Sequence, residues 1–245
     1  MSKIHGRNAR VYLNGQDISN FFNSADLSQP IDTTETTGFG DTDKSVVVGL
    51  RGGAVKLAGY YDSASGTASV DAIFNTVEQA SVDPILTVLT APNIDDKGVS
   101  ASMALTGRQV SAPIAGVVSV TADFLESTTL GLDRVRTVQA KGTLTPSVAG
   151  GTTSAWNGGT ATLQGAVGYM QAFAVAAGTP VVVIEHSADG STSWAALITF
   201  AAMNGTGAAP QAQKASVSGT VQPFQRTTVT GGSAVVWTGI NQPIA

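Results

Sequence analysis

The stretch from Asp32 to Gly53, DTTETTGFGDTDKSVVVGLRGG, constrains the fold of this chain more than any other. Its first part is polar and rich in Thr, its middle is charged, and its end, Ser45–Leu50, is an apolar β-branched run. The middle is too polar for a core, whereas Val46-Val47-Val48 favours a strand. A connection of this length within a compact domain is usually functional or disordered. Two interpretations stay open: a mobile surface loop, or an arm that orders only against a neighbouring subunit.

The second interpretation makes this stretch an assembly element. The backbone groups of an isolated strand are open, and an assembly can pair them where a free chain would aggregate. The side chains that we expect at contacts between subunits are spread along the whole stretch: Glu35, Thr37, Phe39, Asp41, Asp43, Lys44, Val46, Val48 and Arg51.

The charge content limits the classes of partner. Charged residues make up 12% of the chain, about half the usual share, and the net charge is −4. Residues 1–125 carry 8 Lys and Arg against 13 Asp and Glu, a balance of −5. Affinity for nucleic-acid phosphates needs clustered Lys and Arg, which this balance argues against. DNA could still pass close by without being bound.

Several site classes are absent from the sequence itself. The chain has no cysteine, so it has neither disulfides nor thiolate metal sites. No apolar run approaches the roughly 20 residues of a membrane helix, and the first residues, MSKIHGRNAR, lack the apolar core of a signal peptide. We therefore expect no membrane binding by this chain.

Residues 1–125 read as short strands with one helix. Asn14-Gly15 is a strong hairpin signal, and Ser69 is a suitable cap for a helix over Val70–Ala80 with Ile73, Phe74 and Val77 on one side. Alternating apolar residues predict the strands Ala9–Leu13, Ala25–Gln29, Ala54–Tyr61, 85–91, Ala101–Thr106 and Ile114–Phe124.

The second half shows strands without a clear long helix. Its strand candidates are Gly168–Val175, Pro180–His186, Ala195–Ala202, Lys214–Gly219, Gln225–Thr230 and the final Val235-Val236-Trp237. We divide the chain into a first β-domain over 1–126, a connector over 127–159 that includes a Gly/Ser/Thr-rich segment, and a second β-sandwich over 160–245.

The two halves also echo each other. Ser63–Ser69 aligns without gaps on Ser187–Ser193, at an offset close to half the chain, as a duplication predicts. The match is short and made of common turn residues. Two interpretations stay open: a degenerate second copy of the first domain, or two β-sandwiches with ordinary turn chemistry.

No residue pattern predicts catalysis or a cofactor. The histidines are His5 and His186, and neither stands near a carboxylate cluster suited to a metal. The carboxylate pairs Asp41 with Asp43 and Asp95 with Asp96 lie in turn-like stretches. The sequence contains no G-x-S-x-G elbow and no phosphate-binding loop. The three tryptophans, Trp156, Trp194 and Trp237, could form a sugar platform, but core or interface packing is the more common role. We expect no enzyme and no cofactor.

Three segments carry a family resemblance: KIHGRNARVYLNGQDISNFFNS near the start, Glu35–Gly40 in the arm, and VVVIEHSADGSTSWAALITF in the second half. The chain resembles the major tail tube proteins of long-tailed, siphovirus-type bacteriophages, especially those of actinobacterial hosts. The resemblance covers most of the chain and rests on turn and strand patterns.

The resemblance implies a mainly β fold: a β-sandwich or half-barrel with one flanking helix, Val70–Ala80, followed by a second β-sandwich. It implies rings that stack into a hollow tube, with Asp32–Gly53 reaching the next ring. The implied partners are further copies of the chain, the tape measure protein and DNA transiently in the lumen, and the tail terminator and tail tip proteins. The implied location is the virion, after synthesis in the host cytoplasm.

The sequence leaves the number of chains in a ring and the class of function open. A true hexameric ring is favoured over a pseudo-sixfold trimer, because the second half has no counterpart of the arm or of the helix. The other function class is a virion decoration or carbohydrate-binding β-sandwich module that does not polymerise.

Overall fold

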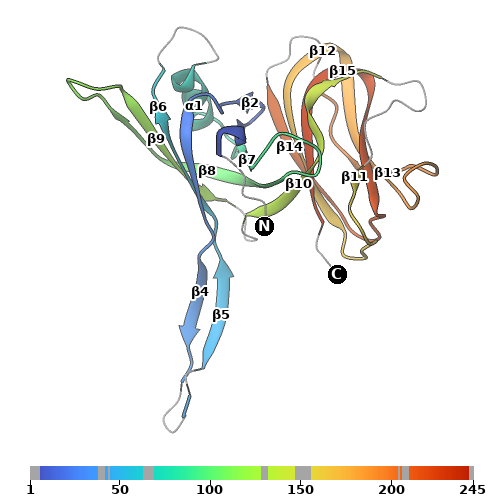
Figure 1. Ribbon diagram of the computed structural model, residues 1–245, viewed down its shortest axis with the longest axis horizontal. Helices are drawn as coiled ribbons and strands as arrows, with labels where there is room; N and C mark the ends of the chain where they lie inside the picture. Colours follow the sequence, from blue (N-terminus) through green and yellow to red (C-terminus); the bar gives the residue numbers. More distant parts are fainter. Residues whose placement is uncertain are drawn as a thin grey trace. The chain divides into compact units, whose positions relative to one another are not determined.

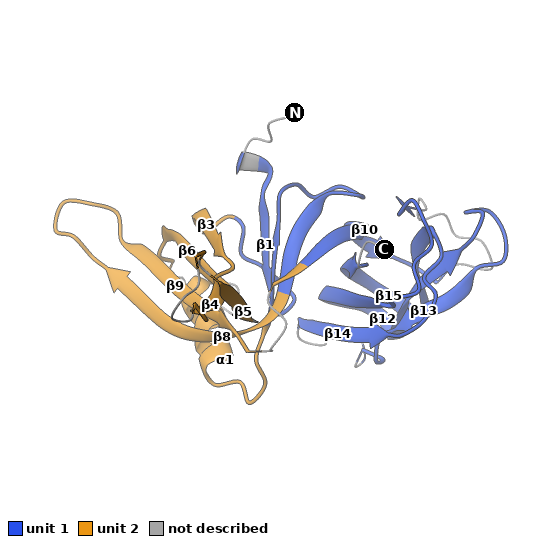
Figure 2. Cartoon of the chain, turned by 90° about the horizontal axis from the view of Figure 1, so that it is seen from below, with its two compact units in different colours: residues 1–19, 85–100, 134–245 blue, residues 20–84, 101–133 orange. Residues whose placement is uncertain are grey.

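The computed structural model describes residues 6–37, 42–43, 45–62, 69–127, 132–146, 156–203, 205 and 210–242. Contacts divide the chain into two compact units that interleave along the sequence (Figure 2): unit 1 is residues 1–19, 85–100 and 134–245, and unit 2 is residues 20–84 and 101–133. The division from the sequence, into 1–126, 127–159 and 160–245, has other boundaries and stays a prediction.

Both units are built of antiparallel strands. Among the described residues, the helical segments are α1, Val70–Glu78, and a short 3₁₀ turn, Gly6–Asn8. This confirms the prediction of a mainly β fold with one helix. No helix in the described part of the chain is long and apolar enough to cross a membrane.

Unit 2 contains a four-stranded sheet in the order β3-β6-β9-β8. The sheet consists of β3 (Phe22–Ser28), β6 (Ala54–Tyr60), β9 (Ser119–Glu126) and residues 101–111 of β8 (Lys97–Ser111). Along β6 the predicted alternation is observed, with Val55 and Leu57 buried and Lys56 and Tyr60 exposed. One face of this sheet therefore carries the core of unit 2.

Helix α1 packs on that buried face. Its apolar side chains, Val70, Ile73, Phe74 and Val77, are buried, and the Phe74 ring lies 6.0 Å from that of Phe22 and 6.2 Å from that of Phe124. The helix begins as predicted, with the Ser69 hydroxyl accepting a hydrogen bond from the Ala72 amide at 3.2 Å. It ends at Glu78, two residues before the predicted end.

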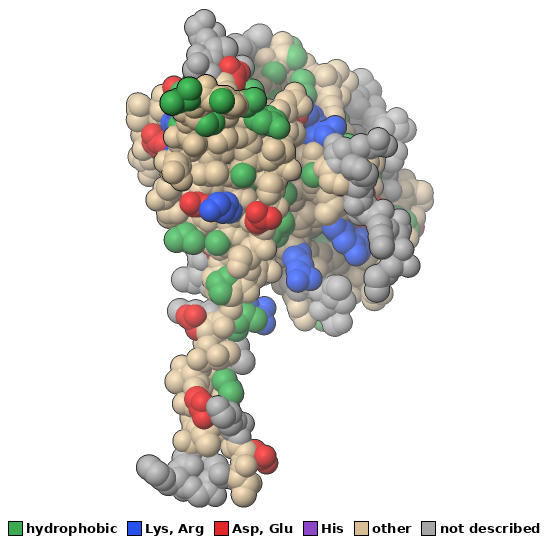
Figure 3. All heavy atoms as spheres, turned by 60° about the vertical axis from the view of Figure 1, so that its left-hand side comes forward, with side chains coloured by type: hydrophobic (Ala, Val, Ile, Leu, Met, Phe, Trp, Pro, Cys, Tyr) green, Lys and Arg blue, Asp and Glu red, His purple; other side chains and the backbone are tan. Residues whose placement is uncertain are grey.

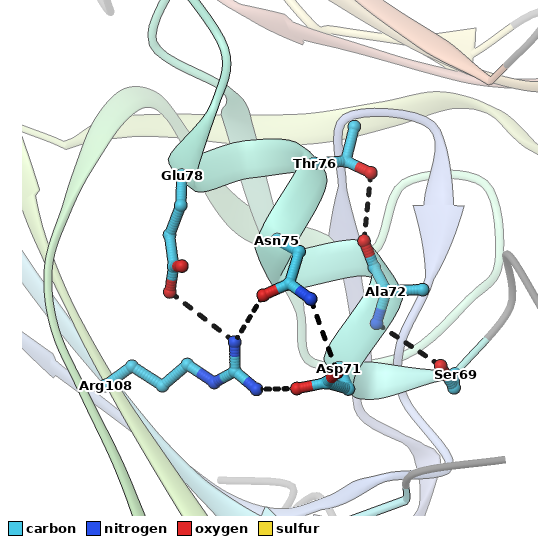
Figure 4. Close-up of polar contacts among 7 residues, drawn as sticks. All are labelled: Ser69, Asp71, Ala72, Asn75, Thr76, Glu78 and Arg108. Atoms are coloured by element: carbon cyan, nitrogen blue, oxygen red, sulfur yellow. Dashed lines mark hydrogen bonds and ion pairs between the residues drawn. The ribbon is translucent and has the colours of Figure 1, made fainter. Parts of the chain in front are cut away.

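Arg108 of β8 ties the outer side of α1 to the sheet (Figure 4). Its guanidinium donates to the Asp71 carboxylate and, at 3.1 Å, to Asn75 Oδ1, and it lies 3.5 Å from Glu78 Oε1. It also stands 5.6 Å from the centre of the Phe74 ring. The hydrogen bond from Arg108 holds the pKa of the Asp71 carboxyl below its usual value. The helix is thus fixed to the sheet by apolar contacts and a charged cluster.

Unit 1 forms most of a larger sheet with the order β13-β12-β15-β10-β8-β7-β1-β2, in which β14 pairs with β12 and β11 pairs with β15. Its strands are β1 (Arg10–Leu13), β2 (Gln16–Asp17), β7 (Ile85–Leu89), β10 (Asp133–Leu144), β11 (Trp156–Asn157), β12 (Ala166–Ser187), β13 (Ala195–Thr199), β14 (Gln211–Val217) and β15 (Phe224–Asn241), together with the first residues of β8.

The long strands β12 and β15 replace four shorter predicted ones. Each runs through a bend where the pairing register shifts. At the bend, Gly178 and Gly231 have φ of +68° and +73°, and a Cβ on Gly178 would lie 2.3 Å from the Gly231 carbonyl oxygen. Before the bend β12 pairs with β14, and after it with β13. Side chains from both parts, including Met170 and Ile184, enter one core cluster. The bent pair therefore builds the β-sandwich predicted for the second half.

The Asn14-Gly15 signal marks the hairpin between β1 and β2, with φ of +47° and +81° at the two residues. Behind this turn lies Gln171 of β12, which is fully buried. Gln171 Oε1 accepts from the Gly15 amide at 2.6 Å, and its Nε2 donates at 3.0 Å to the Ile85 carbonyl and to Thr87 Oγ1. One amide side chain thus joins β12, β7 and the first hairpin.

Three further predictions can be compared with the structure. Residues 114–118, predicted as strand, belong to the connection between β8 and β9. The predicted strand Ala195–Ala202 is observed as β13, which ends three residues earlier, at Thr199. Of the two matching segments that suggested a duplication, the turn Ser187–Ser193 is described but residues 63–68 are not. The duplication therefore stays a prediction.

Candidate assembly surface

The arm is a two-stranded antiparallel ribbon formed by β4 (Ile31–Glu35) and β5 (Val46–Arg51) (Figure 1). The predicted strand at Val46–Val48 is confirmed, and it pairs with a Thr-rich strand, β4, where the sequence predicted only a polar part of the arm. Pairing continues beyond the strands, since the Thr36 amide donates to the Ser45 carbonyl at 2.8 Å and the Ser45 amide to Thr37 Oγ1 at 3.1 Å. The stretch is therefore an ordered hairpin over much of its length.

The candidate contact residues take several places on this ribbon. Glu35 and Val46 are register partners near its far end, Val48 pairs with Thr33, and Arg51 pairs with Ile31 near the body of unit 2. Thr37 accepts the hydrogen bond described above, and Asp43 is exposed. Phe39, Asp41 and Lys44 lie outside the described residues, as does the side chain of Val48.

Both faces of the ribbon are open to solvent. Consecutive residues of a strand point to opposite faces, and the neighbours Val46 and Val47 are each about half exposed. All residues of β4 are exposed. Within the described part of the chain, neither strand pairs with a third one. An isolated two-stranded ribbon is at best marginally stable in water, so the arm gains stability from any surface that covers it.

The base of the arm is anchored in unit 2. The Gln29 side chain donates to the Leu132 carbonyl at 2.9 Å, and the Glu126 amide donates to the Gly53 carbonyl at 2.8 Å. A Cβ on Gly53 would lie 2.7 Å from Leu132 Cγ, so glycine is needed for this close approach. The ribbon therefore leaves the body of unit 2 from a fixed point.

Exposed hydrophobic side chains are concentrated in unit 2. Figure 3, which looks onto unit 2, shows such side chains near the top of the view and along the arm. Among the described residues, the large ones in unit 2 are Leu27, Ile31, Val46, Val47, Tyr60, Val82, Val110, Ile114, Val117 and Leu125, whereas unit 1 contributes Leu163. Exposed apolar side chains that gather in one part of a chain are typical of surfaces that contact other proteins. Unit 2 is thus the candidate interaction module.

Sequence reasoning missed part of this surface. It placed Ile114 and Val117 in a strand, but both are exposed in the connection between β8 and β9. A usable signal existed, because Pro113 and Gly116 are turn residues within this apolar run. Those residues argue for a loop at this point.

The residues considered for chemistry have structural roles or lie outside the description. His186 Nδ1 accepts a hydrogen bond from the Gln222 amide at 3.2 Å, and burial lowers the pKa of this histidine. Asp95 Oδ1 accepts from Arg136 at 2.5 Å and from Trp156 at 2.7 Å, which fixes a turn. His5 is not described. In the described part of the chain, no group of three or more His, Asp or Glu residues could hold a metal ion.

The tryptophans do not form a common binding platform. Trp156 and Trp237 are buried in the core. Trp194 is covered on its ring by the Arg226 guanidinium, 4.2 Å from the ring centre, and Arg226 is itself held by Glu185 at 2.7 Å. Packing is therefore the role of Trp156 and Trp237, as expected.

Comparisons with known proteins give remote likenesses. No protein-family model and no curated protein matches the sequence. A chain from the virion of a native gene transfer agent particle is 13% identical, with a TM-score of 0.43 over 53% of this chain and 98% of that one. The SPP1 Dit protein, of the hub adsorption apparatus, is 13% identical with a TM-score of 0.37, over 95% of this chain and 98% of that one.

A third likeness is to a chain of the phage p2 baseplate in its activated conformation. It is 11% identical, with a TM-score of 0.34 over 96% of this chain and 98% of that one. All of these TM-scores lie below 0.5, so these likenesses do not decide the function of this chain.

Proposed function

We propose that this chain is a non-enzymatic structural protein of a phage-type virion tail, and that it self-assembles into the stacked rings of a hollow tail tube through which DNA passes. The observation that carries the proposal is the arm, a paired ribbon with aliphatic side chains open on both faces. Such a ribbon is stabilised when a neighbouring subunit covers it. The resemblance of the N-terminal segment and of the arm to tail tube proteins supports the same function.

The distribution of exposed hydrophobic side chains supports different roles for the two units. Unit 2 carries nearly all of those described, so we assign the contacts between subunits to it. Unit 1 carries Leu163 in this class and has its own core clusters. We therefore assign no ring-closing contact to unit 1.

We propose a ring of six chains, because the resemblance to tail tube proteins implies six tube domains in each ring and each chain supplies one arm. A pseudo-sixfold trimer needs two equivalent assembly elements in each chain, and the second half of the sequence has no counterpart of the arm. Head-to-tail contacts between identical chains close into a ring when the rotation between them is an exact fraction of a turn. We place six chains in each ring and assign the arm to contacts with the next ring.

We assign the uncovered face of the β3-β6-β9-β8 sheet to the lumen. One cross-strand row on this face consists of Asp26, Lys56 and Asp123, with Lys56 Nζ 3.8 Å from Asp123 Oδ1. The row carries a net charge of −1, and its lysine is beside a carboxylate. A conduit must release DNA, and a surface without clustered cations has little affinity for phosphates. The tape measure protein would occupy the same lumen before DNA, and the tail terminator and tail tip proteins would contact the ends of the tube.

Electron microscopy of the concentrated pure protein tests the proposal. We expect stacked rings or hollow tubes, whereas dispersed single particles at every concentration and salt condition would favour a non-polymerising decoration or carbohydrate-binding protein. A glycan array run in parallel separates these two, because specific glycan binding by dispersed particles is expected from the second and not from a tube protein.

A further inference from the structure

The connection between β8 and β9, residues 112–118, is a second apolar projection of unit 2. Ile114 is 109% exposed and Val117 is 68% exposed, and Val110 at the end of β8 is 42% exposed. We refer to residues 110–118 as the hairpin tip. From Gln109 to Ala122 the sequence has no charged residue. This combination of full exposure and absent charge is unusual for a loop that faces only water.

The hairpin tip is held in place by its strands. The β8–β9 ladder continues to the pair Ser111 and Ser119. Within the turn, a Cβ on Gly116 would lie 2.9 Å from Pro113 Cγ, so the turn is tightly closed. A tip that is already ordered loses little conformational entropy when it binds. Its side chains are therefore presented in a defined arrangement.

The lack of basic residues around the hairpin tip disfavours two kinds of partner, a membrane and nucleic acid. Loops and helices that insert into membrane surfaces carry basic residues and aromatic side chains beside the apolar ones, and residues 109–122 contain neither. The nearest basic residue in the sequence, Arg108, is turned to helix α1 and bonded to Asp71. Nucleic acid is excluded on the same ground, because phosphates need cations. The tip is suited to an apolar protein surface.

The valines of β5 in the arm of the same chain offer such a surface, beside the polar strand β4. Val46 and Val47 are exposed on opposite faces of β5. The arm and the hairpin tip leave the body of unit 2 in different directions (Figure 1), so one chain cannot cover its own arm with its own tip. A head-to-tail contact between identical chains joins two different patches of the same chain. The tip and the arm are such a pair.

We propose that the hairpin tip of one chain packs against the arm of a second chain. This inference rests on the proposed function, since it requires self-assembly. It adds the partner surface for the arm and assigns Ile114 and Val117 as the side chains that bury against it. Because the tip is uncharged, the contact is expected to persist at high salt.

The first test combines Ile114→Asp with Val117→Asp and compares this variant with Leu163→Asp. Leu163 is 79% exposed but lies in unit 1, so it controls for the loss of any exposed aliphatic side chain. Sedimentation velocity over a concentration series measures assembly, and circular dichroism checks the fold. We expect the double variant to need a concentration about tenfold higher or more to assemble, with Leu163→Asp like the wild type. Equal assembly of all three proteins would overturn the inference.

The second test uses the absence of native cysteines. Ile114→Cys and Val47→Cys are prepared as separate proteins, mixed, assembled and oxidised, with Leu163→Cys replacing Ile114→Cys in the control. We expect a mixed disulfide between chains in the first mixture only, because a disulfide requires Cα atoms within about 7 Å. If particles form but that disulfide does not, the tip–arm contact is wrong while self-assembly stands. If the wild type never assembles, the proposed function fails as well.

Flotation with vesicles of anionic phospholipid gives a further outcome. We expect no binding by the wild type. Binding that Ile114→Asp with Val117→Asp abolishes would assign the tip to membranes and overturn the contact with a second chain.

Discussion

Replacing Gln171 with Leu should destabilise unit 1 by removing a buried polar junction. The side chain is fully buried and makes three hydrogen bonds, to the Gly15 amide, the Ile85 carbonyl and Thr87 Oγ1. Leu has a similar volume, so Gln171→Leu tests these bonds with little change in packing. The Ile85 carbonyl keeps a hydrogen bond from the Asn14 amide, and Thr87 keeps one to Ser100. The Gly15 amide is the group that loses its acceptor.

The expected loss follows from these contacts. A buried donor left without an acceptor costs about 1–3 kcal/mol, and each ordinary hydrogen bond contributes about 0.5–1.5 kcal/mol. Part of this is offset because Leu is more favourably buried than Gln. We expect a net loss of about 2–3 kcal/mol in the free energy of unfolding. For a chain of this size that lowers Tm by roughly 4–12 °C.

Urea unfolding and amide hydrogen exchange measure this prediction. Exchange reports the Gly15 amide itself, whose protection should fall more than that of core amides in unit 2. Gln213→Leu is the matched control: Gln213 bonds to the Ala201 amide and carbonyl at 2.7 and 3.0 Å, but these contacts are exposed. It should cost less than about 1 kcal/mol. A Gln171→Leu variant as stable as the control, with Gly15 still protected, would refute the reasoning.

Gln171→Glu extends the test to pH. A carboxylate could still accept from Gly15, but it would face the Ile85 carbonyl, an acceptor. Burial without a cation raises the pKa of the introduced Glu in the folded state above its unfolded value of about 4.3. The variant is therefore closest to the wild type below pH 4.3 and loses stability as pH rises through the folded-state pKa. A pH-independent difference from the wild type would contradict this.

The remaining predictions concern assembly and acid stability. Replacing Thr37–Asp43 by a short Gly-Ser loop should leave a soluble folded protein that forms no tubes in electron microscopy; normal tube yield would show that the arm is not needed. Burial lowers the pKa of His186 in the folded state below its unfolded value of about 6.5. The neutral His186 side chain therefore contributes its full share of the free energy of unfolding above pH 6.5, and this share is lost as pH falls through the folded-state pKa. Urea midpoints between pH 7.5 and 5 should then fall more for the wild type than for His186→Gln, and parallel curves would contradict that. Native mass measurement of isolated rings should give six chains, and three would establish the pseudo-sixfold trimer.

Local sequence signals determined several elements by themselves. Asn14-Gly15 specifies its hairpin because both residues tolerate positive φ. Ser69 caps α1 through its own hydroxyl, and the alternation in β6 assigns a buried and an exposed face before any partner strand is known. The Val-rich end of the arm likewise indicated a strand. In these cases the forces that set the structure act between residues close in sequence.

Tertiary structure decided what depends on distant partners. The bends of β12 and β15 look like loops in the sequence, but pairing between the two strands carries each one through its Gly-containing bend. The polar first strand of the arm forms because β5 pairs with it. The run at residues 114–118 has strand composition but becomes a tip, since β8 and β9 stop pairing at Ser111 and Ser119. The polar side chain of Gln171 can be buried in the sheet only because Gly15, Ile85 and Thr87 supply its hydrogen-bond partners. Such contacts join residues far apart in the chain, so they cannot be predicted from the local composition of either segment.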